Sequence, residues 1–159
     1  MPEFTANTIQ LHIAAWFEEI EDFKFLLLKR AEHLRVYPGI WQAITGTIEG
    51  NEMAVQTAVR ELKEETGVEP LKFWTVPYMT SFFNPLKDAV NFSPVFGCLF
   101  DKSSEIRISS EHQDHGWFTL EEADKLLILP SHSKGNHVFN DYILKNTDNE
   151  YFEFNIFGV

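Results

Sequence analysis

The spacing of apolar residues near the start of the chain predicts two neighbouring strands. Ile9, Leu11 and Ile13 fall at every second position of the run TIQLHIAAWF, which is the period of a strand with one face toward a core. Residues 23–30, FKFLLLKR, are apolar almost without interruption and follow a turn near residues 21–22. Such a run is typical of a more deeply buried strand.

Two further strands are predicted in the middle of the chain. Residues 73–83 and 91–100 are rich in aromatic and β-branched residues, and they flank a turn at 84–88 that contains proline and aspartate. Residues 105–108, EIRI, are a candidate for a shorter strand.

Helical signals follow the strands. Thr119 and Glu122 have the spacing of a capping box and predict the start of a short helix. A last helix is expected to begin near Ser133 and to run to Lys145. We therefore expect an α/β (α+β) fold in which a mixed β-sheet lies between α-helices. The chain has 159 residues, of which 44% are hydrophobic, so a single domain over residues 1–159 is expected.

One more helix is predicted between Asn51, a good capping residue, and Gly67, which takes the left-handed conformation easily. Glu61 and Glu65 are four residues apart on this helix, and Glu64 lies beside them. Three carboxylates thus share one band of the helix surface. The band borders a single apolar stripe, which consists of Val55, Ala58, Val59 and Leu62.

Carboxylates on one band repel each other unless a cation offsets their charge. Mg²⁺ and Mn²⁺ prefer carboxylate, carbonyl and water oxygens, with substrate phosphates completing the shell. Arg60 can reach back to a glutamate and fix its rotamer, and Glu52 is placed to be that partner. An ordinary solvated acidic helix is the alternative. Gly46 and Gly50, just before the helix, favour instead a loop whose backbone approaches a ligand closely.

These residues form one continuous motif. Gly46 is followed by five residues and Glu52, and then by seven residues and the run RELKEETGV at 60–68. This is the pattern of the Nudix box with every defining position filled, so the chain resembles the Nudix hydrolases. The flanking residues 41–49, WQAITGTIE, resemble the bacterial subgroup that includes dihydroneopterin triphosphate pyrophosphatase and the dATP pyrophosphohydrolases.

The resemblance implies a Nudix fold and a hydrolase that cleaves a nucleoside diphosphate linked to another moiety. Water attacks phosphorus in such enzymes, with Mg²⁺ as cofactor and Mn²⁺ as a possible substitute. Arg60 and Glu52 match the orienting pair of the motif, and the general base is Glu64 or Glu65. The residues that match metal ligands are Glu61, Glu64, Glu65 and, through its carbonyl, Gly46.

Nudix enzymes often draw a further carboxylate from outside the motif. Glu111, a few residues before the Trp-Phe pair at 117–118, is the candidate for that metal ligand and catalytic residue. A solvated loop glutamate is the alternative for this position. The neighbouring His112 is either a packing histidine or a contact to phosphate or metal.

Substrate contacts are expected from basic and aromatic residues outside the motif. Lys29 and Arg30 end the second strand, where a positive charge can meet the phosphates, although a strand-end charge is the plain alternative. Trp41, Phe82 and Phe83 offer flat faces for stacking on a base or pterin ring. Core packing is the competing interpretation for all three aromatic residues.

Composition narrows the class of protein and of partner. The formal net charge of -11 and the lack of a basic stripe argue against nucleic acid as a partner. The same charge should repel a small nucleotide-like substrate unless metal ions reverse the sign at the site. Cys98 is the only cysteine, so an intramolecular disulfide is impossible and a cytoplasmic location is expected. No leader sequence and no membrane-spanning run are recognised.

Three functions remain open. The first is a Mg²⁺-dependent pyrophosphohydrolase acting on a nucleoside triphosphate or on dihydroneopterin triphosphate. Diadenosine polyphosphates are the rival substrates, and a nucleotide-sensing module without catalysis is the third possibility. Catalysis is favoured because every glutamate of the motif is present. The apolar tail at 151–157 is expected to add an edge strand or to lie in a homodimer interface.

Overall fold

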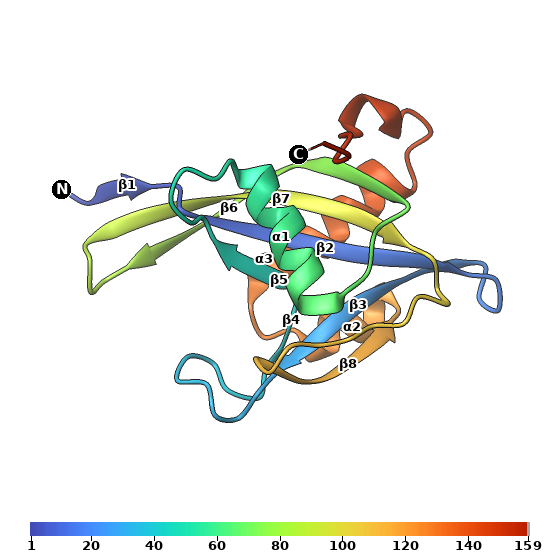
Figure 1. Cartoon of the computed structure of the whole chain (residues 1–159), viewed down its shortest axis with the longest axis horizontal. Helices are drawn as coiled ribbons and strands as arrows, with labels where there is room; N and C mark the ends of the chain where they lie inside the picture. The colour runs from blue at the N-terminus through green and yellow to red at the C-terminus, as the bar shows by residue number, and fades with distance from the viewer. Residues whose placement is uncertain (159) are drawn as a thin grey trace.

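The strands of the protein form one mixed sheet of eight (Figure 1). The structure is a computed structural model that describes residues 1–158. The strands are β1 (Glu3–Thr5), β2 (Thr8–Phe17), β3 (Asp22–Arg30), β4 (Trp41–Gln42), β5 (Ile44–Thr47), β6 (Lys72–Asn84), β7 (Ala89–Phe100) and β8 (His112–Phe118). The helices are α1 (Ala54–Thr66), α2 (Leu120–Leu126) and α3 (Pro130–Phe139), followed by a π-helix at Asn140–Leu144 and a 3-10 helix at Asn149–Phe152.

Strand β2 lies at the centre of the sheet. One edge of β2 pairs in parallel with β7. The other edge pairs first with β5, through Thr8 to Leu11, and then with β3, through Ala14 to Phe17. Because β2 changes partner along its length, the ends of β5 and β3 diverge beside it.

Helices cover both faces of the sheet. In Figure 1, α1 crosses one face while α2 and α3 lie behind the other. Leu11 and Ile13 of β2 pack into the core beneath α1, and Ala14 packs into the core that contains Phe139 of α3. The expected fold, a mixed sheet between helices, is therefore confirmed. Among residues 1–158, no helix combines the length and the apolar character that crossing a membrane requires.

The predicted strands at 8–17, 23–30, 73–83 and 91–100 are present, but the short strand at 105–108 is wrong. That segment has no strand partner within the described residues. Ile106 and Ile108 pack instead against the core beneath α1, and the Arg107 N–H donates to the Thr66 carbonyl, 2.9 Å away. The alternation of polar and apolar residues at 105–108 therefore reflects the packing of an irregular segment and not a strand.

Helix boundaries differ from expectation at two N-termini. Helix α1 is capped at Met53, whose N–H donates to Gln56 Oε1 at 2.8 Å, and not at Asn51, which lies in the preceding turn. The C-terminus is as expected, because Gly67 has a φ of 68°. Helix α3 begins at Pro130, three residues before Ser133, since proline suits the first turn of a helix. The capping box of Thr119 and Glu122 is confirmed.

The apolar tail lies along the free edge of β6. Glu153 forms a single antiparallel bridge with Trp74, and the Phe154 N–H donates to the Phe73 carbonyl at 2.8 Å. The tail therefore adds backbone pairing at this edge without forming a strand within residues 1–158. Tyr151 and Phe157 remain exposed.

Candidate active site

Arg60 of α1 binds the loop before the helix and two glutamates of its own helix. Its Nε lies 2.8 Å from Glu52 Oε1, and its Nη2 donates to the Thr47 carbonyl at 3.0 Å. Nη1 lies 3.0 Å from Glu61 Oε1 and 3.3 Å from Glu64 Oε2. Hydrogen bonding from Arg60 lowers the pKa of Glu52 to about 2. A planar guanidinium satisfies these directions at once, whereas a lysine ammonium cannot.

Gly46 of β5 lies directly against the side chain of Glu61. A Cβ built on Gly46 would lie 2.4 Å from Glu61 Cγ and 2.6 Å from Oε1, closer than real contacts allow. Burial raises the pKa of Glu61 to about 7, although Arg60 opposes the shift. The absence of a side chain at 46 thus lets a half-buried carboxylate approach the backbone of the strand.

Glu65 is the most deeply buried carboxylate of the motif, with 5% of its surface exposed. Ser109 Oγ donates to Glu65 Oε2 at 2.8 Å, and His112 Nδ1 lies 2.6 Å from the same oxygen. Burial opposes ionisation, but His112 and Ser109 outweigh it and hold the pKa of Glu65 below its ordinary value. Gln42 Nε2 contacts the far nitrogen of His112 at 3.2 Å. His112 is therefore a buried histidine that contacts a carboxylate of the motif.

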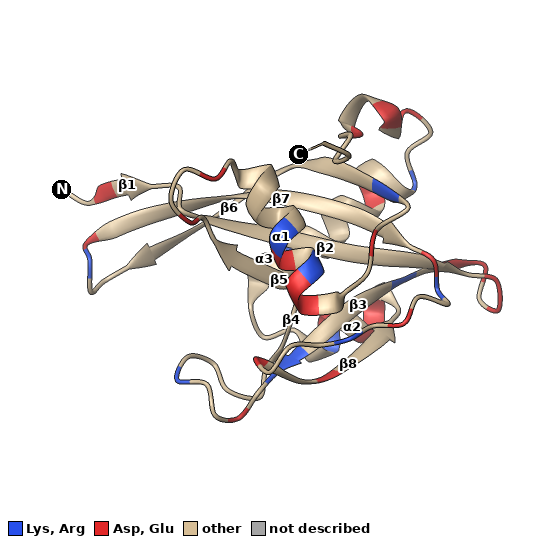
Figure 2. Cartoon of the chain, in the orientation of Figure 1, with Lys and Arg blue, Asp and Glu red and all other residues tan. Residues whose placement is uncertain are grey.

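The glutamates line one cavity of about 330 Å³ between β5 and α1. Its carboxylates are those of Glu49, Glu61, Glu64, Glu65 and Glu111, so the structure brings Glu111 to the motif as expected. Within residues 1–158, no three such groups converge on a single point. The donor set nevertheless fits a hard divalent cation, which takes carboxylate and carbonyl oxygens. Figure 2 shows acidic and basic residues alternating along the C-terminal half of α1, next to β5.

A second cavity, of about 450 Å³, adjoins the glutamate cavity and shares Thr8 and Thr45 with it. Arg30, Phe82 and Phe83 all line this second cavity. Arg30 Nε donates to the Val36 carbonyl at 3.0 Å, which fixes the guanidinium at the cavity wall. Arg30 is also close enough to Glu65 to favour the ionised carboxylate.

Trp41 and Lys29 do not line these cavities. The Trp41 ring packs edge-on against Phe118, with centroids 5.2 Å apart, in a small cluster beneath α2. Core packing is therefore the role that the structure gives Trp41. Lys29 pairs with Trp41 and Asp114 across the sheet, next to a bulge that separates it from Arg30.

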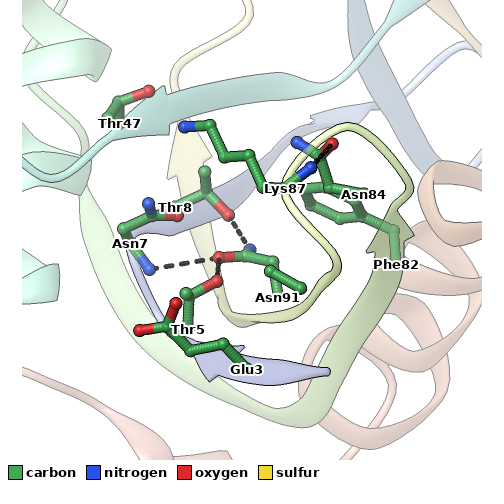
Figure 3. A pocket seen from close by; sticks show the side chains of 10 residues that line it. Glu3, Thr5, Asn7, Thr8, Thr47, Phe82, Asn84, Lys87 and Asn91 are labelled. Atoms are coloured by element: carbon green, nitrogen blue, oxygen red, sulfur yellow. Dashed lines mark hydrogen bonds between the residues drawn. The ribbon is translucent and has the colours of Figure 1, made fainter. Parts of the chain in front are cut away.

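A third cavity, of about 440 Å³, is lined by residues of β1, β2, β5, β6 and β7 (Figure 3). It shares Thr8 and Thr47 with the glutamate cavity. In Figure 3, Lys87 extends from the β6–β7 turn across this cavity, toward the strand that carries Thr47. Asn91 Oδ1 accepts from Thr5 Oγ1 at 2.8 Å and thereby ties β1 to the cavity floor.

Several residues that line these cavities or contact their lining were not predicted from the sequence. Ser109 is two residues from Glu111, so its position near the predicted carboxylate was the only available signal. Gln10, His132 and Lys87 come from a central strand, a helix and a turn that are far from the motif in sequence. Nothing in their local sequence distinguishes them from structural residues.

Comparison with known proteins assigns the family. The NUDIX domain matches residues 11–140, and the chain belongs to the Nudix family. The chain is 30% identical over 105 residues to mouse bis(5'-nucleosyl)-tetraphosphatase [asymmetrical], covering 65% of this chain and 69% of that protein. It is 28% identical over 109 residues to the nucleoside triphosphatase NudI of Escherichia coli, covering 64% and 77%.

Solved structures show the same fold. A NUDIX hydrolase from Listeria monocytogenes superposes with a TM-score of 0.75 at 24% identity, covering 91% of this chain and 97% of the other. The dihydroneopterin triphosphate pyrophosphohydrolase of Escherichia coli gives a TM-score of 0.67 at 22% identity, covering 86% and 97%. Together with the hydrolase relatives, the family identifies a hydrolase of phosphoric anhydride bonds in nucleoside di- and triphosphates and related compounds. Such hydrolases generally use divalent metal ions such as Mg²⁺.

Proposed function

We propose that the protein is a Mg²⁺-dependent pyrophosphohydrolase that acts on a nucleoside triphosphate or on dihydroneopterin triphosphate. The observation that carries the proposal is the junction of two cavities at Thr8 and Thr45. One cavity is lined by carboxylates that suit a metal and its phosphates. The other offers Phe82 and Phe83 for a flat ring system and Arg30 for a phosphate.

The metal would be held by carboxylates and one backbone carbonyl. Bound Mg²⁺, or Mn²⁺ in its place, would supply Lewis-acid activation of water and neutralise phosphate charge. The close approach of Glu61 to Gly46 supports a shared role for that carboxylate and the carbonyl of the same strand. The proposed ligands are Gly46, Glu61, Glu64, Glu65 and Glu111.

The remaining roles concern position and protonation. Arg60 and Glu52 hold the loop before α1 against the helix, since Arg60 bonds both Glu52 and the Thr47 carbonyl. Ser109 and His112 keep Glu65 ionised, which suits a ligand or a base. Glu64 is more exposed and bonds only to Arg60 among residues 1–158. Either Glu64 or Glu65 takes the proton from the attacking water, and Glu111 completes the catalytic group from the opposite wall.

A second candidate substrate is a dinucleoside polyphosphate. The third cavity shares Thr8 and Phe82 with the cavity lined by Arg30, Phe82 and Phe83, which we call the aromatic cavity. The two have nearly the same volume, about 440 Å³ and about 450 Å³. Both cavities adjoin the glutamate cavity, and two such cavities suit a polyphosphate with an organic group at each end. The relation to the mouse tetraphosphatase supports the same candidate.

Turnover of a substrate panel tests the proposal. Purified protein with Mg²⁺ is incubated with the four common dNTPs, dihydroneopterin triphosphate, diadenosine tetraphosphate and ADP-ribose. Pyrophosphate and phosphate are measured for the triphosphates, and the nucleotide products of all compounds are separated by chromatography, because diadenosine tetraphosphate and ADP-ribose are cleaved without releasing either anion. Release of pyrophosphate from a triphosphate, dependent on Mg²⁺, is the expected result. Binding without turnover of any compound would favour the sensing module. Preference for diadenosine tetraphosphate would favour the second candidate.

The remaining attributes are also proposals. We treat residues 1–159 as one domain, located in the cytoplasm and without nucleic-acid or membrane partners. Exposed apolar residues of the tail, Tyr151 and Phe157, make a homodimer the assembly to test by size-exclusion chromatography with light scattering.

A further inference from the structure

Two polar side chains in the wall of the aromatic cavity are held by buried partners. Gln10 of β2 and His132 of α3 both line the cavity, and each is only 3% exposed. They are neighbours, because Gln10 Nε2 donates to the carbonyl of Ser131 at 3.0 Å. The partners of each side chain determine which of its atoms is left for a ligand.

The Ser131 carbonyl fixes the amide of Gln10. A carbonyl oxygen only accepts, so the Gln10 atom facing it must be the amide nitrogen. The same nitrogen lies 2.7 Å from His12 Nε2, which takes its second hydrogen. Both hydrogens of the amide are thus used inside the protein, and Oε1 is the atom that remains.

A buried relay behind Gln10 supports this orientation. Because His12 Nε2 accepts, its proton is on Nδ1, which lies 2.7 Å from Asn136 Oδ1. Burial, helped by the neighbouring His132, lowers the pKa of His12 to about 3, so the ring is neutral near pH 7. A Cβ at Gly135 would lie 2.1 Å from His12 Nε2, so glycine is needed for the helix to close over the relay.

His132 is fixed from the other side. The Ala43 N–H donates to His132 Nδ1 at 3.0 Å, so this nitrogen carries no proton. Burial lowers the pKa of His132 to about 4, and the neutral ring therefore carries its proton on Nε2. The site offers one acceptor, Gln10 Oε1, and one donor, His132 Nε2–H.

Neither of these two atoms has a hydrogen-bond partner within residues 1–158. The fully buried side-chain atoms without a hydrogen bond in that range are Trp74 Nε1 and Asn136 Nδ2, and His112 Nδ1 has only its contact with Glu65 Oε2. Gln10 Oε1 and His132 Nε2 are not among them and are therefore accessible. Since both residues are almost completely buried and line the cavity, the accessible side of these atoms is the cavity itself.

We propose that Gln10 and His132 read one edge of a planar nitrogen heterocycle, with Gln10 Oε1 accepting from a ligand N–H and His132 Nε2–H donating to an adjacent ring nitrogen or carbonyl oxygen. This inference rests on the proposed function and specifies what the aromatic cavity holds. Phe82 and Phe83 offer the ring faces, and Arg30 is the one charged group among the described residues that line the cavity. An apolar group in the same place would leave both polar atoms unpaired, so it is disfavoured.

The variant His132→Asn tests the donor without removing the structural bond. The asparagine Oδ1 can still accept from the Ala43 N–H, but no N–H remains at the position of Nε2. We expect KM for the best nucleoside triphosphate to rise at least about tenfold. Inorganic tripolyphosphate, tested as substrate or competitive inhibitor, carries no base and should be affected at least about tenfold less. The matched control is His115→Asn, at an exposed position of β8.

A second measurement probes the acceptor from the ligand side. Wild-type protein should prefer ATP to purine riboside triphosphate, which lacks the exocyclic amine, or GTP to ITP. Gln10→Met should reduce whichever preference is found. Equal losses of nucleotide and tripolyphosphate in His132→Asn, or unchanged kinetics, would overturn the proposal.

Failure of the proposed function gives a different result. If the wild-type protein turns over no nucleotide, calorimetry with AMP, GMP, CMP and UMP replaces kinetics. Weaker binding of these to His132→Asn would then support the recognition pair while rejecting the enzyme. Equal binding, or no binding by the wild-type protein, would reject the pair.

Discussion

Glu61 packs so tightly against Gly46 that the two residues cannot both carry an ordinary side chain at their present positions. A Cβ on Gly46 would lie 2.4 Å from Glu61 Cγ. The glycine of the motif therefore acts by leaving space for a carboxylate. The φ of Gly46 is not in the left-handed region, so backbone freedom is not the reason for glycine here.

Gly46→Ala should displace Glu61 and lower kcat at least about tenfold, because a metal-assisted step is sensitive to misplaced ligands. Gly50→Ala is the matched control, since Gly50 has nothing within 4 Å of its Cβ position. Its φ of 53° makes the control variant less stable while leaving Glu61 in place. Steady-state kinetics and thermal unfolding of both variants separate the two effects. Equal kcat in Gly46→Ala and wild type would contradict the steric explanation.

Glu65→Gln should reduce turnover at least about a hundredfold while the fold is kept. Glutamine is similar in shape and can still accept from Ser109, but it removes the charge that we assign to metal binding. Turnover and circular dichroism are measured beside the control Glu121→Gln, which alters an exposed residue of α2. Activity near the wild-type level would remove Glu65 from the proposed ligands.

The buried histidines should make folding sensitive to acid. The pKa of His12 is lowered to about 3 and that of His132 to about 4, from an ordinary 6.5. The unfolded chain therefore binds more protons in this range, so their contribution to stability is complete above pH 6.5 and is lost as the pH falls toward 4 and then 3. Each histidine changes the free energy of unfolding by about 1.4 kcal/mol per pH unit in that window.

Urea unfolding between pH 7.5 and 5 measures the slope. His12→Gln should be less stable than wild type at pH 7.5 but should depend less on pH. His33→Gln, at an exposed position, should keep the wild-type slope. An unchanged slope in His12→Gln would show that His12 is not the titrating group.

Lys87 separates the two candidate substrates. If the third cavity holds the second group of a dinucleoside polyphosphate, Lys87→Gln should lower kcat/KM for diadenosine tetraphosphate about tenfold, because a phosphate contact is lost. The value for a mononucleoside triphosphate should change less than about twofold. Lys102→Gln, at a surface ion pair with Glu18 and Glu19, is the control. Equal losses for both substrates would place Lys87 at the phosphates common to them.

The sequence was most informative where local patterns determine structure. The run from Gly46 to Val68 predicted the helix, its end at Gly67 and the pairing of Arg60 with Glu52. It could not predict the first residue of α1, because the turn with Gly50 places Asn51 outside the helix. The cap therefore depends on the conformation of the loop between β5 and α1, whose first residue is held by Arg60 through the Thr47 carbonyl.

Burial of polar residues was not predictable from alternation. Gln10 and His12 fall between Ile9, Leu11 and Ile13, so the pattern alone would place them at solvent. They are buried because α3 covers that face of β2, which is a long-range contact that local sequence does not encode. The ligand recognition that we infer for Gln10 and His132 depends on this same contact between α3 and β2.

The acidic lining of the glutamate cavity also has a consequence for association kinetics. A polyanion that approaches a chain of net charge -11 is repelled before it reaches the metal, so long-range steering works against encounter. Salt screens this repulsion over about 10 Å at 0.1 M. At saturating Mg²⁺, kcat/KM should therefore rise with added KCl at low ionic strength. The opposite trend would show that Arg30 and bound cations already dominate the field that the substrate meets.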